Sequence, residues 1–393
     1  MTWHGDKKPT GRVRTAPGRA INCLRTVCVG SHIAPVSSRH SISESMATNK
    51  NQHFVPRCYL RPFTGNGEGR SINVFNIDRA KLILGAPVKN QCSKDYFYGS
   101  NQYLENAIQA VEGAYSEQIK SLLGGAVAIS QSASIVLRRF WLLQNMRTEA
   151  ASVRAVELST GLAEALDPDG RDFALTIKEA VQLAMHAYAE SMTCIDDLNL
   201  CLIRNTSSRP FVTSDDPAIL TNRWHFHRQL HLTRSFGLGS AGVIGMLPIS
   251  EILLCVLYDA EFYDITAPNG FADISSDSDV ELVNEHQFLN CHANIYTRTE
   301  SEHFLLNQLN QAMSRRIYPS RETTYSVRDC EVEGGDLVRY KVVNSKPNEP
   351  HEALIHSRQL HASPRAWPSF LRWKYRGHFA PDDKSTRRGT SRW

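Results

Sequence analysis

The stretch "AGVIGMLPISEILLCVLY" (Ala241–Tyr258) is the longest apolar run in this chain of 393 residues. Pro248, Ser250 and Glu251 interrupt it near its middle. A helix that crosses a membrane needs about 20 consecutive apolar residues, and the interrupted run does not supply them. Each half has the length and the apolar content of a buried strand. The stretch therefore predicts two consecutive sheet strands and no membrane span.

Helical periodicity dominates the part of the chain before this run. A first amphipathic pattern ends at Gly124–Gly125, and its apolar residues recur three or four positions apart, at Leu104, Ile108, Val111, Tyr115, Ile119 and Leu122. A second pattern runs from about Ser130 to Leu158 and is apolar on most of its circumference, so it predicts a buried helix. A third helix is predicted across Phe173–Asp197.

Strand-like segments dominate the part that follows. They are "LNLCLIRN", "PFVTSDDPAIL" and the two halves of 242–259, and two further helices are predicted near 279–292 and 300–316. Helices grouped first and strands grouped later indicate an α+β fold. We therefore expect a helical N-terminal half packed on a mainly antiparallel sheet from the C-terminal half.

The domain organisation follows from composition and patterning. Residues 1–45 lack any regular period and predict a disordered basic leader, and we expect Met46 to be the true start of the chain. Residues 46–320 form a single predicted α+β domain. The stretch "CEVEGGDLVRYKVV" has a Gly-Gly turn and predicts a β-hairpin extension at 321–346. Residues 347–393 predict an irregular basic tail.

Charge and cysteine usage restrict the partners and the compartment. Residues 46–356 carry a net charge of −8, whereas nucleic-acid binding depends on the neutralisation of phosphates. We therefore do not expect this body to bind nucleic acid, although the basic ends leave that option open. The nine cysteines include no CxxC pair, and the N-terminus lacks the apolar core of a signal peptide. Both features favour reduced thiols and a cytoplasmic location; neither indicates an oligomeric state.

The stretch "NQHFVPRCYLRPFT" (Asn51–Thr64) concentrates histidine, arginine and aromatic residues. Pro56 suits the first position of a short helix, which Pro62 then limits. In such a helix Tyr59, Leu60 and Phe63 can bury together, and Arg57 and Arg61 share one face. His53 lies near the free amides of the N-terminus. Together they have the chemistry of an anion site. The alternative is a structural clasp in which the aromatic residues anchor the segment.

Two later features carry the other polar candidates. Gln144 and Arg147 lie on one face of the predicted buried helix, and a buried guanidinium needs a partner. Asp215 and Asp216 in "TSDDP" sit on a turn that Pro217 ends. We therefore expect Arg147 to form a buried ion pair with this turn.

These motifs occur in an order that resembles a known family. "QHFVPRCYLRPF", "LLQNMRT", "PFVTSDDPAIL", "MLPIS" and "NEHQFLNCHANIY" are similar to the motifs of the bacterial family known only as domain of unknown function 4238. The resemblance covers about Lys50 to Tyr318. Arg57 stands where the family commonly has Gln, and Asp216 where it usually has Asn. The resemblance implies membership in a family and a shared fold, and it implies no activity.

The sharpest functional hypothesis joins the two motifs. If His53 reaches Asp215, the pair has the make-up of a general base with its orienting carboxylate. Arg57, Arg61, Gln144, Arg147 and Asp216 would then bind a small anionic substrate, and hydrolysis of a phosphoester-like bond is the natural reaction class. A cleft shared by His53, Arg147 and Asp215 is the arrangement that this hypothesis requires.

The alternative is a non-catalytic binding or interaction module in which the same residues are structural. His53, Asp215 and Asp216 also have the donor atoms of a divalent-metal site, although we predict no metal and the sequence indicates no cofactor. "WHFHRQLH" supplies His225, His227 and His231 without an acidic or cysteine partner, so it predicts a ligand rim or a solvent-facing strand in preference to zinc.

Overall fold

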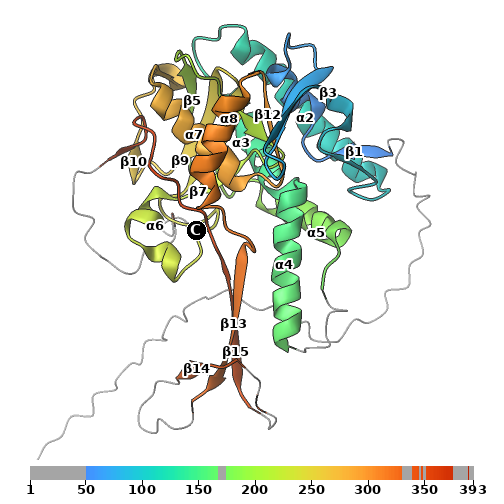
Figure 1. Cartoon of the computed structure of the whole chain (residues 1–393), viewed down its shortest axis with the longest axis vertical. Coiled ribbons are helices and arrows are strands. Elements are labelled where there is room, and N and C mark those ends of the chain that lie inside the picture. Colours follow the sequence, from blue (N-terminus) through green and yellow to red (C-terminus); the bar gives the residue numbers. More distant parts are fainter. Residues whose placement is uncertain are drawn as a thin grey trace, which may run out of the picture. The chain divides into compact units, whose positions relative to one another are not determined.

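The computed structural model describes residues 50–166, 174–329, 339–344, 347, 351–374 and 388. The predicted leader 1–45 and Met46 lie outside these residues, as do the Gly-Gly turn of the predicted hairpin and most of the tail after 374. Within the described part the protein is a mixture of helices and mainly antiparallel sheets (Figure 1).

Eight α-helices lie within the described residues. They are α1 (Arg57–Leu60), α2 (Gln102–Leu123), α3 (Gln131–Arg147), α4 (Glu149–Leu166), α5 (Ile177–Ser191), α6 (Arg223–His227), α7 (Asp277–Asn290) and α8 (Glu302–Met313). Polar caps fix where the longer helices begin. The Asn101 side chain accepts the amides of Tyr103 and Leu104, and Thr176 forms a capping box with Glu179 at the start of α5.

The single helix predicted from Ser130 to Leu158 is wrong, because two helices cover this region. Thr148 has an extended backbone with φ −71° and ψ 162°, and it separates α3 from α4. Its hydroxyl accepts the Ala151 amide at 3.1 Å, which is the hydrogen bond of a helix N-cap. Threonine competes for backbone donors in this way, and periodicity alone does not reveal such a break.

The central sheet has five strands in the order β11-β5-β9-β8-β7. These are β5 (Asn199–Asn205), β7 (Ile219–Thr221), β8 (Ile244–Ser250), β9 (Leu253–Tyr258) and β11 (Phe271–Ile274). β8 and β9 pair antiparallel, and every residue of both strands is buried. The opening apolar run is therefore a hairpin at the centre of the core, as predicted. β11 is the exception in direction, because it pairs parallel to β5.

A second sheet combines strands that lie far apart in the sequence. Its order is β3-β2-β12-β6, with β2 (Ser71–Asn76), β3 (Lys81–Pro87), β6 (Thr213–Ser214) and β12 (Asn294–Thr297), all antiparallel. The strands thus do not come from the C-terminal half alone. None of the helices in the described part combines the length and the apolarity that crossing a bilayer requires.

The opening motif packs against the central hairpin. Tyr59, Leu60 and Phe63 are all fully buried, as predicted. The Tyr59 hydroxyl donates to the Pro248 carbonyl at 2.6 Å and lies 2.6 Å from the Thr213 hydroxyl. Pro56 is the residue that precedes α1 and is not its first residue. The aromatic residues of the motif therefore join the first helix to the sheet.

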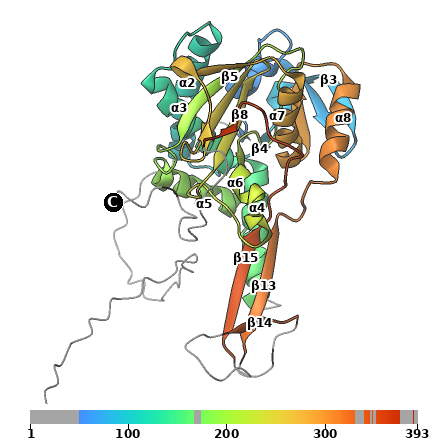
Figure 2. The ribbon, with the colours of Figure 1, turned by 90° about the vertical axis from the view of Figure 1, so that its left-hand side faces the viewer.

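A smaller antiparallel sheet has three strands, β14-β13-β15. β13 (Arg321–Arg328) pairs with β14 (Tyr340–Val342) on one side and with β15 (Ala353–Gln359) on the other. β15 lies in the segment for which the sequence predicts irregular structure. None of its residues is fully buried, so the strand depends on its pairing with β13 and not on an apolar pattern. Figures 1 and 2 both show α4 alongside this sheet.

Candidate ligand-binding site

His53 ends β1 (Asn51–His53), which pairs with β4 (Ser93–Asp95), and it is half-buried. Its Nε2 atom is buried, and the described residues provide no hydrogen-bond partner for it. Burial lowers the pKa of His53, and the neighbouring Arg57 guanidinium lowers it further. His53 and Arg57 line a pocket of about 210 Å³ against α2. The structure thus brings these two predicted residues together.

Asp215 has a different role in the structure. Both of its carboxylate oxygens accept main-chain amides, from His292 at 2.7 Å and from Ala293 and Asn294 at 2.8 Å each. Burial raises the pKa of Asp215 to about 6, against the effect of these amide hydrogen bonds. The carboxylate therefore anchors the loop between α7 and β12. No hydrogen bond joins it to His53 in the described part of the chain, so the expected base–carboxylate pair is not formed there.

Arg147 is fully buried and its partner is not the one predicted. Its Nη1 donates to Glu112 Oε1 at 2.8 Å, and its Nε donates to the Phe54 carbonyl at 3.0 Å. With its amide oxygen turned towards Arg147, the buried Gln144 accepts two further bonds, at 2.9 and 3.0 Å. Glu112 lies on α2, which packs beside α3, so the guanidinium connects two helices and the opening motif. The predicted ion pair with the 215–216 turn is wrong.

Asp216 pairs with a different arginine. Its fully buried carboxylate accepts Arg154 Nη1 at 2.6 Å, Asn290 Nδ2 at 2.8 Å and the Thr148 hydroxyl at 2.5 Å. These partners come from α4, from the end of α7 and from the break before α4. Asp216 therefore ties two helices together and neutralises Arg154. The Arg154 side chain stays partly accessible, with 23% of it exposed.

The two exposed arginines of the opening motif separate. Arg57 lines the small pocket, whereas Arg61 Nε donates to the Gly67 carbonyl at 2.8 Å and holds the following loop. Arg61 is absent from that pocket's wall. The short 3-10 helix Arg61–Phe63 that follows α1 changes the direction of the side chains, so a shared face for the two guanidiniums does not form.

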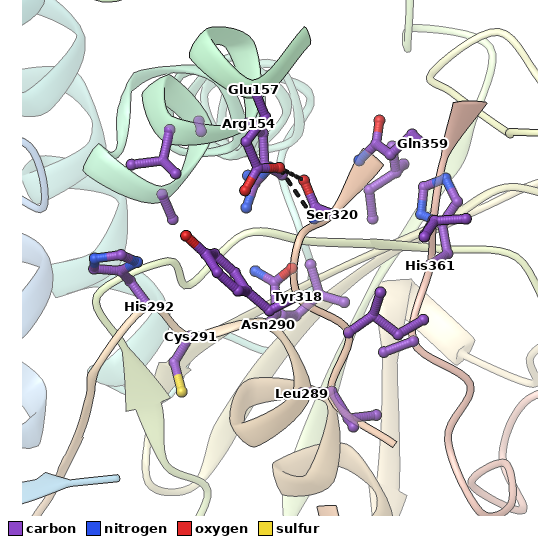
Figure 3. A pocket seen from close by; sticks show the side chains of 18 of the residues that line it. Arg154, Glu157, Leu289, Asn290, Cys291, His292, Tyr318, Ser320, Gln359 and His361 are labelled. Carbon is purple, nitrogen blue, oxygen red and sulfur yellow. Dashed lines mark hydrogen bonds between the residues drawn. The ribbon is translucent and has the colours of Figure 1, made fainter. Parts of the chain in front are cut away.

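A larger cavity lies elsewhere, between α4, the end of α7 and the segments 316–321 and 359–362 (Figure 3). Its volume is about 710 Å³, which falls within the range of about 300–1,000 Å³ for small-molecule sites. Apolar side chains and polar groups both line it. The residues used below are Arg154, Glu157, Asn290, Tyr318, Arg321 and His361.

The positive charges around this cavity are neutralised to different degrees. Arg154 forms an ion pair with Asp216. Arg316 donates to main-chain carbonyls at the end of α7, including that of Cys291 at 2.8 Å. Like Arg316, Arg321 has no ion pair with a carboxylate among the described residues, and it makes fewer hydrogen bonds than Arg316. Its Nε donates to the Arg154 carbonyl at 3.2 Å, and the described residues place no carboxylate within ion-pair distance of it. Burial lowers the pKa of Arg321, Glu157 raises it, and Arg154 lowers it again. An arginine remains protonated in proteins, so this charge faces the cavity.

Glu157 is committed to a structural contact. It accepts both the amide and the hydroxyl of Ser320, and Figure 3 shows both bonds across the cavity wall. The amide bond has a length of 3.0 Å. The carboxylate therefore holds the start of β13 against α4.

Two buried histidines of the cavity, His286 and His361, are neutral at physiological pH. Burial lowers the pKa of His361 to about 3, and His225, Arg154 and Arg321 lower it further. Burial alone lowers the pKa of His286 to about 4. His361 stacks on Phe236 with ring centroids 3.6 Å apart and an interplanar angle of 15°. These two histidines therefore add no positive charge to that of Arg154, Arg316 and Arg321 in the cavity wall.

The described side chains form no metal-binding cluster. No group of three or more His, Cys, Asp or Glu residues in that part of the chain has the arrangement of a metal site. "WHFHRQLH" forms α6 and a short 3-10 helix (Leu230–Leu232), so the predicted strand is wrong there. His225 is buried, and neither ring nitrogen has a hydrogen-bond partner among the described residues.

Sequence reasoning missed most of this cavity. Arg321 and His361 lie in segments interpreted as a hairpin extension and an irregular tail, and no functional residue was predicted in either segment. Arg154 follows Arg147 by seven positions, about two turns of the single predicted helix, but the break at Thr148 places the two arginines on different helices. Asp216 is the predicted residue that comes closest to the cavity, since it holds both Arg154 and Asn290 in its wall.

The fold and the site define an α+β protein with a mixed polar and apolar cavity. The family model of DUF4238, described as a protein of unknown function, matches residues 51–301. The match covers more than half of the chain, and the protein belongs to this family. No curated protein and no solved structure matches it. The segments 316–321 and 359–362 lie beyond the matched residues, so the cavity is completed by parts of the chain outside the family's model.

Proposed function

We propose that the protein is a binding module for a small organic anion, which occupies the cavity of about 710 Å³. The observation that carries this proposal is Arg321, a half-buried guanidinium at the cavity wall without a carboxylate partner among the described residues. Partial burial of a cation that no carboxylate contacts is unfavourable, and a bound anion offsets that cost. The lining also contains Met146, Leu220 and Leu289, which favour an apolar body attached to the anionic group.

The position of Arg154 supports the same function. Arg154 and Arg321 both act electrostatically on His361, so the three side chains surround one region of the cavity. Asp216 neutralises only one of the two arginines. A negative group on a ligand would therefore pair with Arg321, for which the described residues provide no ion-pair partner. Carboxylates and phosphates both match the geometry of a guanidinium.

The experiment is calorimetric titration of the full chain with benzoate, phenyl phosphate and inorganic phosphate. We expect benzoate or phenyl phosphate to bind and Arg321→Gln to weaken binding at least about tenfold, because a hydrogen bond to a charged group contributes about 1.5–3 kcal/mol. Arg70→Gln is the matched control, since Arg70 is highly exposed, at 84% of its side chain. Equal affinities of the wild type and Arg321→Gln, or no binding of any of the three anions, would contradict the proposal.

A hydrolase acting on a phosphoester-like substrate is the second candidate. The observation that favours it is the Ser320 hydroxyl, which donates to Glu157 beside Arg321. A carboxylate in this position can take a proton from an attacking hydroxyl or water. The catalytic role of His53 and Asp215 stays a prediction, because the structure does not join them by a hydrogen bond. The test is the hydrolysis of p-nitrophenyl phosphate. If the wild type releases no p-nitrophenol, this activity is excluded. If it does, loss of the activity in folded Glu157→Gln or in folded His53→Ala assigns the catalytic role to Glu157 or to His53.

We also propose that binding takes place in the cytoplasm. The described cysteines, Cys58, Cys92, Cys194, Cys201, Cys255 and Cys291, are free thiols. Free thiols persist in a reducing compartment. The proposal concerns a small ligand and not a nucleic acid, because the body of the chain carries a net charge of −8 over residues 46–356.

A further inference from the structure

A groove of about 720 Å³ extends the cavity along α4 and β13. The cavity and the groove share four lining residues: Val153, Glu157, Tyr318 and Arg321. The α4 side of the groove is lined by residues three or four positions apart, which form one helical face: Val153, Val156, Glu157, Thr160, Gly161, Glu164 and Ala165. The groove therefore runs continuously from the anion site along the helix.

The β13 side of the groove is formed by alternate residues of the strand. Arg321, Thr323 and Tyr325 line it, because side chains two positions apart share a face. A Cβ atom on Gly161 would lie 2.5 Å from the Thr323 hydroxyl oxygen, so helix and strand are in close contact at this level. Glycine allows this approach, and the groove therefore has a closed floor and one open side.

The open side is an unpaired strand edge. The main-chain groups of even-numbered residues point towards β15. The carbonyl of Ser320, which precedes β13, accepts the Leu360 amide at 2.8 Å, and the Arg328 amide donates to the Glu352 carbonyl at 3.0 Å. The odd residue Tyr325 points the other way and accepts the Val343 amide at 3.1 Å. Main-chain groups alternate along a strand, so the amides and carbonyls of Arg321 and Thr323 also point away from β15.

In the described part of the chain, no strand occupies this edge between Arg321 and Thr323. β14 pairs with β13 from Ser326 to Arg328, and Val343 extends that contact only to Tyr325. An exposed edge of this kind is a template for another extended chain. Recognition of peptides by strand addition uses such an edge together with side-chain pockets beside it.

Charge determines which part of a peptide fits the cavity end of the groove. The edge begins at Arg321, whose guanidinium has no carboxylate partner among the described residues, and Arg154 lies next to it. A carboxyl terminus supplies a carboxylate at the end of an extended chain. A peptide that enters the cavity with its C-terminus would run opposite to β13, and antiparallel pairing is the more stable arrangement.

We propose that the ligand is the free carboxyl terminus of an extended polypeptide, which adds as an antiparallel strand to β13 beside α4 and places its carboxylate at Arg321. This inference rests on the proposed anion-binding function and names its ligand class. Pairing with Arg321 and Thr323 would satisfy their main-chain groups, and α4 would contact every second side chain of the peptide.

The test starts with selection from a pool of random octapeptides that have free C-terminal carboxylates, using the immobilised full chain. Retained peptides are identified by mass spectrometry, and the best one is synthesised in three forms: free acid, C-terminal amide, and free acid with alternate amides N-methylated. Fluorescence anisotropy measures their affinities. We expect the amide and the N-methylated form each to bind at least about tenfold more weakly, because one loses the charge and the other loses the strand pairing.

Two proline variants test the edge from the side of the protein. Thr323→Pro removes an amide that points to the open edge and leaves the bonds to β15 intact. Ser357→Pro is the matched control, since Ser357 lies opposite Thr323 in the register and its amide points to the other edge of the sheet. We expect about tenfold weaker peptide binding for Thr323→Pro and an unchanged affinity for Ser357→Pro, with circular dichroism confirming that both fold.

The outcomes separate this inference from the function on which it rests. Equal affinity for the free acid, the amide and the N-methylated form would overturn it. If benzoate or phenyl phosphate binds in an Arg321-dependent manner and no peptide is retained, the anion site stands and the peptide proposal fails. If neither small anions nor peptides bind, both fail. The N-methylated peptide keeps the test decisive even if Thr323→Pro does not fold.

Discussion

Arg154 and Asp216 form an ion pair beneath the cavity, with 2.6 Å between Nη1 and Oδ2, although 62 positions separate them in the sequence. The same carboxylate also binds Asn290, so it fixes both α4 and the end of α7. Asp216 thus acts on a ligand only through the side chains that it positions. It is a positioning residue and does not line the cavity itself.

Asp216→Asn should destabilise the fold by about 2–4 kcal/mol, because it removes the counter-charge of Arg154. The effect is large because residue 216 is fully buried, so water cannot replace the lost carboxylate. Urea denaturation measures the change in the free energy of unfolding. Asp273→Asn is the matched control: Asp273 pairs with Arg204 at 3.9 Å on the surface and should contribute less than about 1 kcal/mol. Equal effects of the two substitutions would show that the buried pair has no special importance.

Glu112→Gln should cost more stability than Arg147→Met. Glu112→Gln leaves a fully buried guanidinium without a carboxylate, which typically costs about 3–5 kcal/mol. Arg147→Met leaves the Glu112 carboxylate, whose side chain is 23% exposed and can be hydrated. Thermal or urea unfolding of both variants gives the order. Asp95→Asn, which removes a surface pair with Lys50, should have an effect below about 1 kcal/mol. The reverse order would contradict the structural role of Arg147.

Asp215 should make the protein less stable as the pH rises. Its folded-state pKa of about 6 exceeds the ordinary value of 3.8, so its contribution is full below pH 3.8 and is lost as the pH rises through 6. The loss amounts to about 3 kcal/mol. Asp215→Asn removes this titration. The difference in unfolding free energy between wild type and variant should therefore change between pH 4 and pH 7, and a constant difference would refute the prediction.

His286 should have the opposite effect. Its folded-state pKa of about 4 lies below the ordinary 6.5, so its contribution is full above pH 6.5 and is lost as the pH falls through 4. His286→Phe keeps an aromatic ring beside Trp367, whose centroid lies 5.5 Å from that of His286. The unfolding free energy of the variant minus that of the wild type should therefore be about 3 kcal/mol larger at pH 4 than at pH 7. Chemical denaturation at both pH values is the measurement, and parallel pH profiles would exclude the effect.

Local sequence predicted those elements whose formation depends on neighbouring residues. The apolar run 241–258 predicted the central hairpin, the three- and four-residue periodicity predicted α2, and the apolar circumference of the second pattern predicted the burial of α3. The opening motif predicted the burial of Tyr59, Leu60 and Phe63. The break at Thr148 was missed because a threonine cap is compatible with either a continuous or an interrupted helical pattern.

The partners of charged residues required the tertiary structure. The sequence determined that Arg147 is buried and needs a carboxylate, since an apolar helix surrounds it, but both Glu112 and the 215–216 turn met that requirement. Packing of α2 beside α3 selected Glu112 and left Asp216 to Arg154. The cavity and the open edge of β13 likewise exist only after α4, β13 and the segment 359–362 meet. Residue spacing along a chain fixes local periodicity, whereas long-range pairing depends on which surfaces bury the most apolar area together.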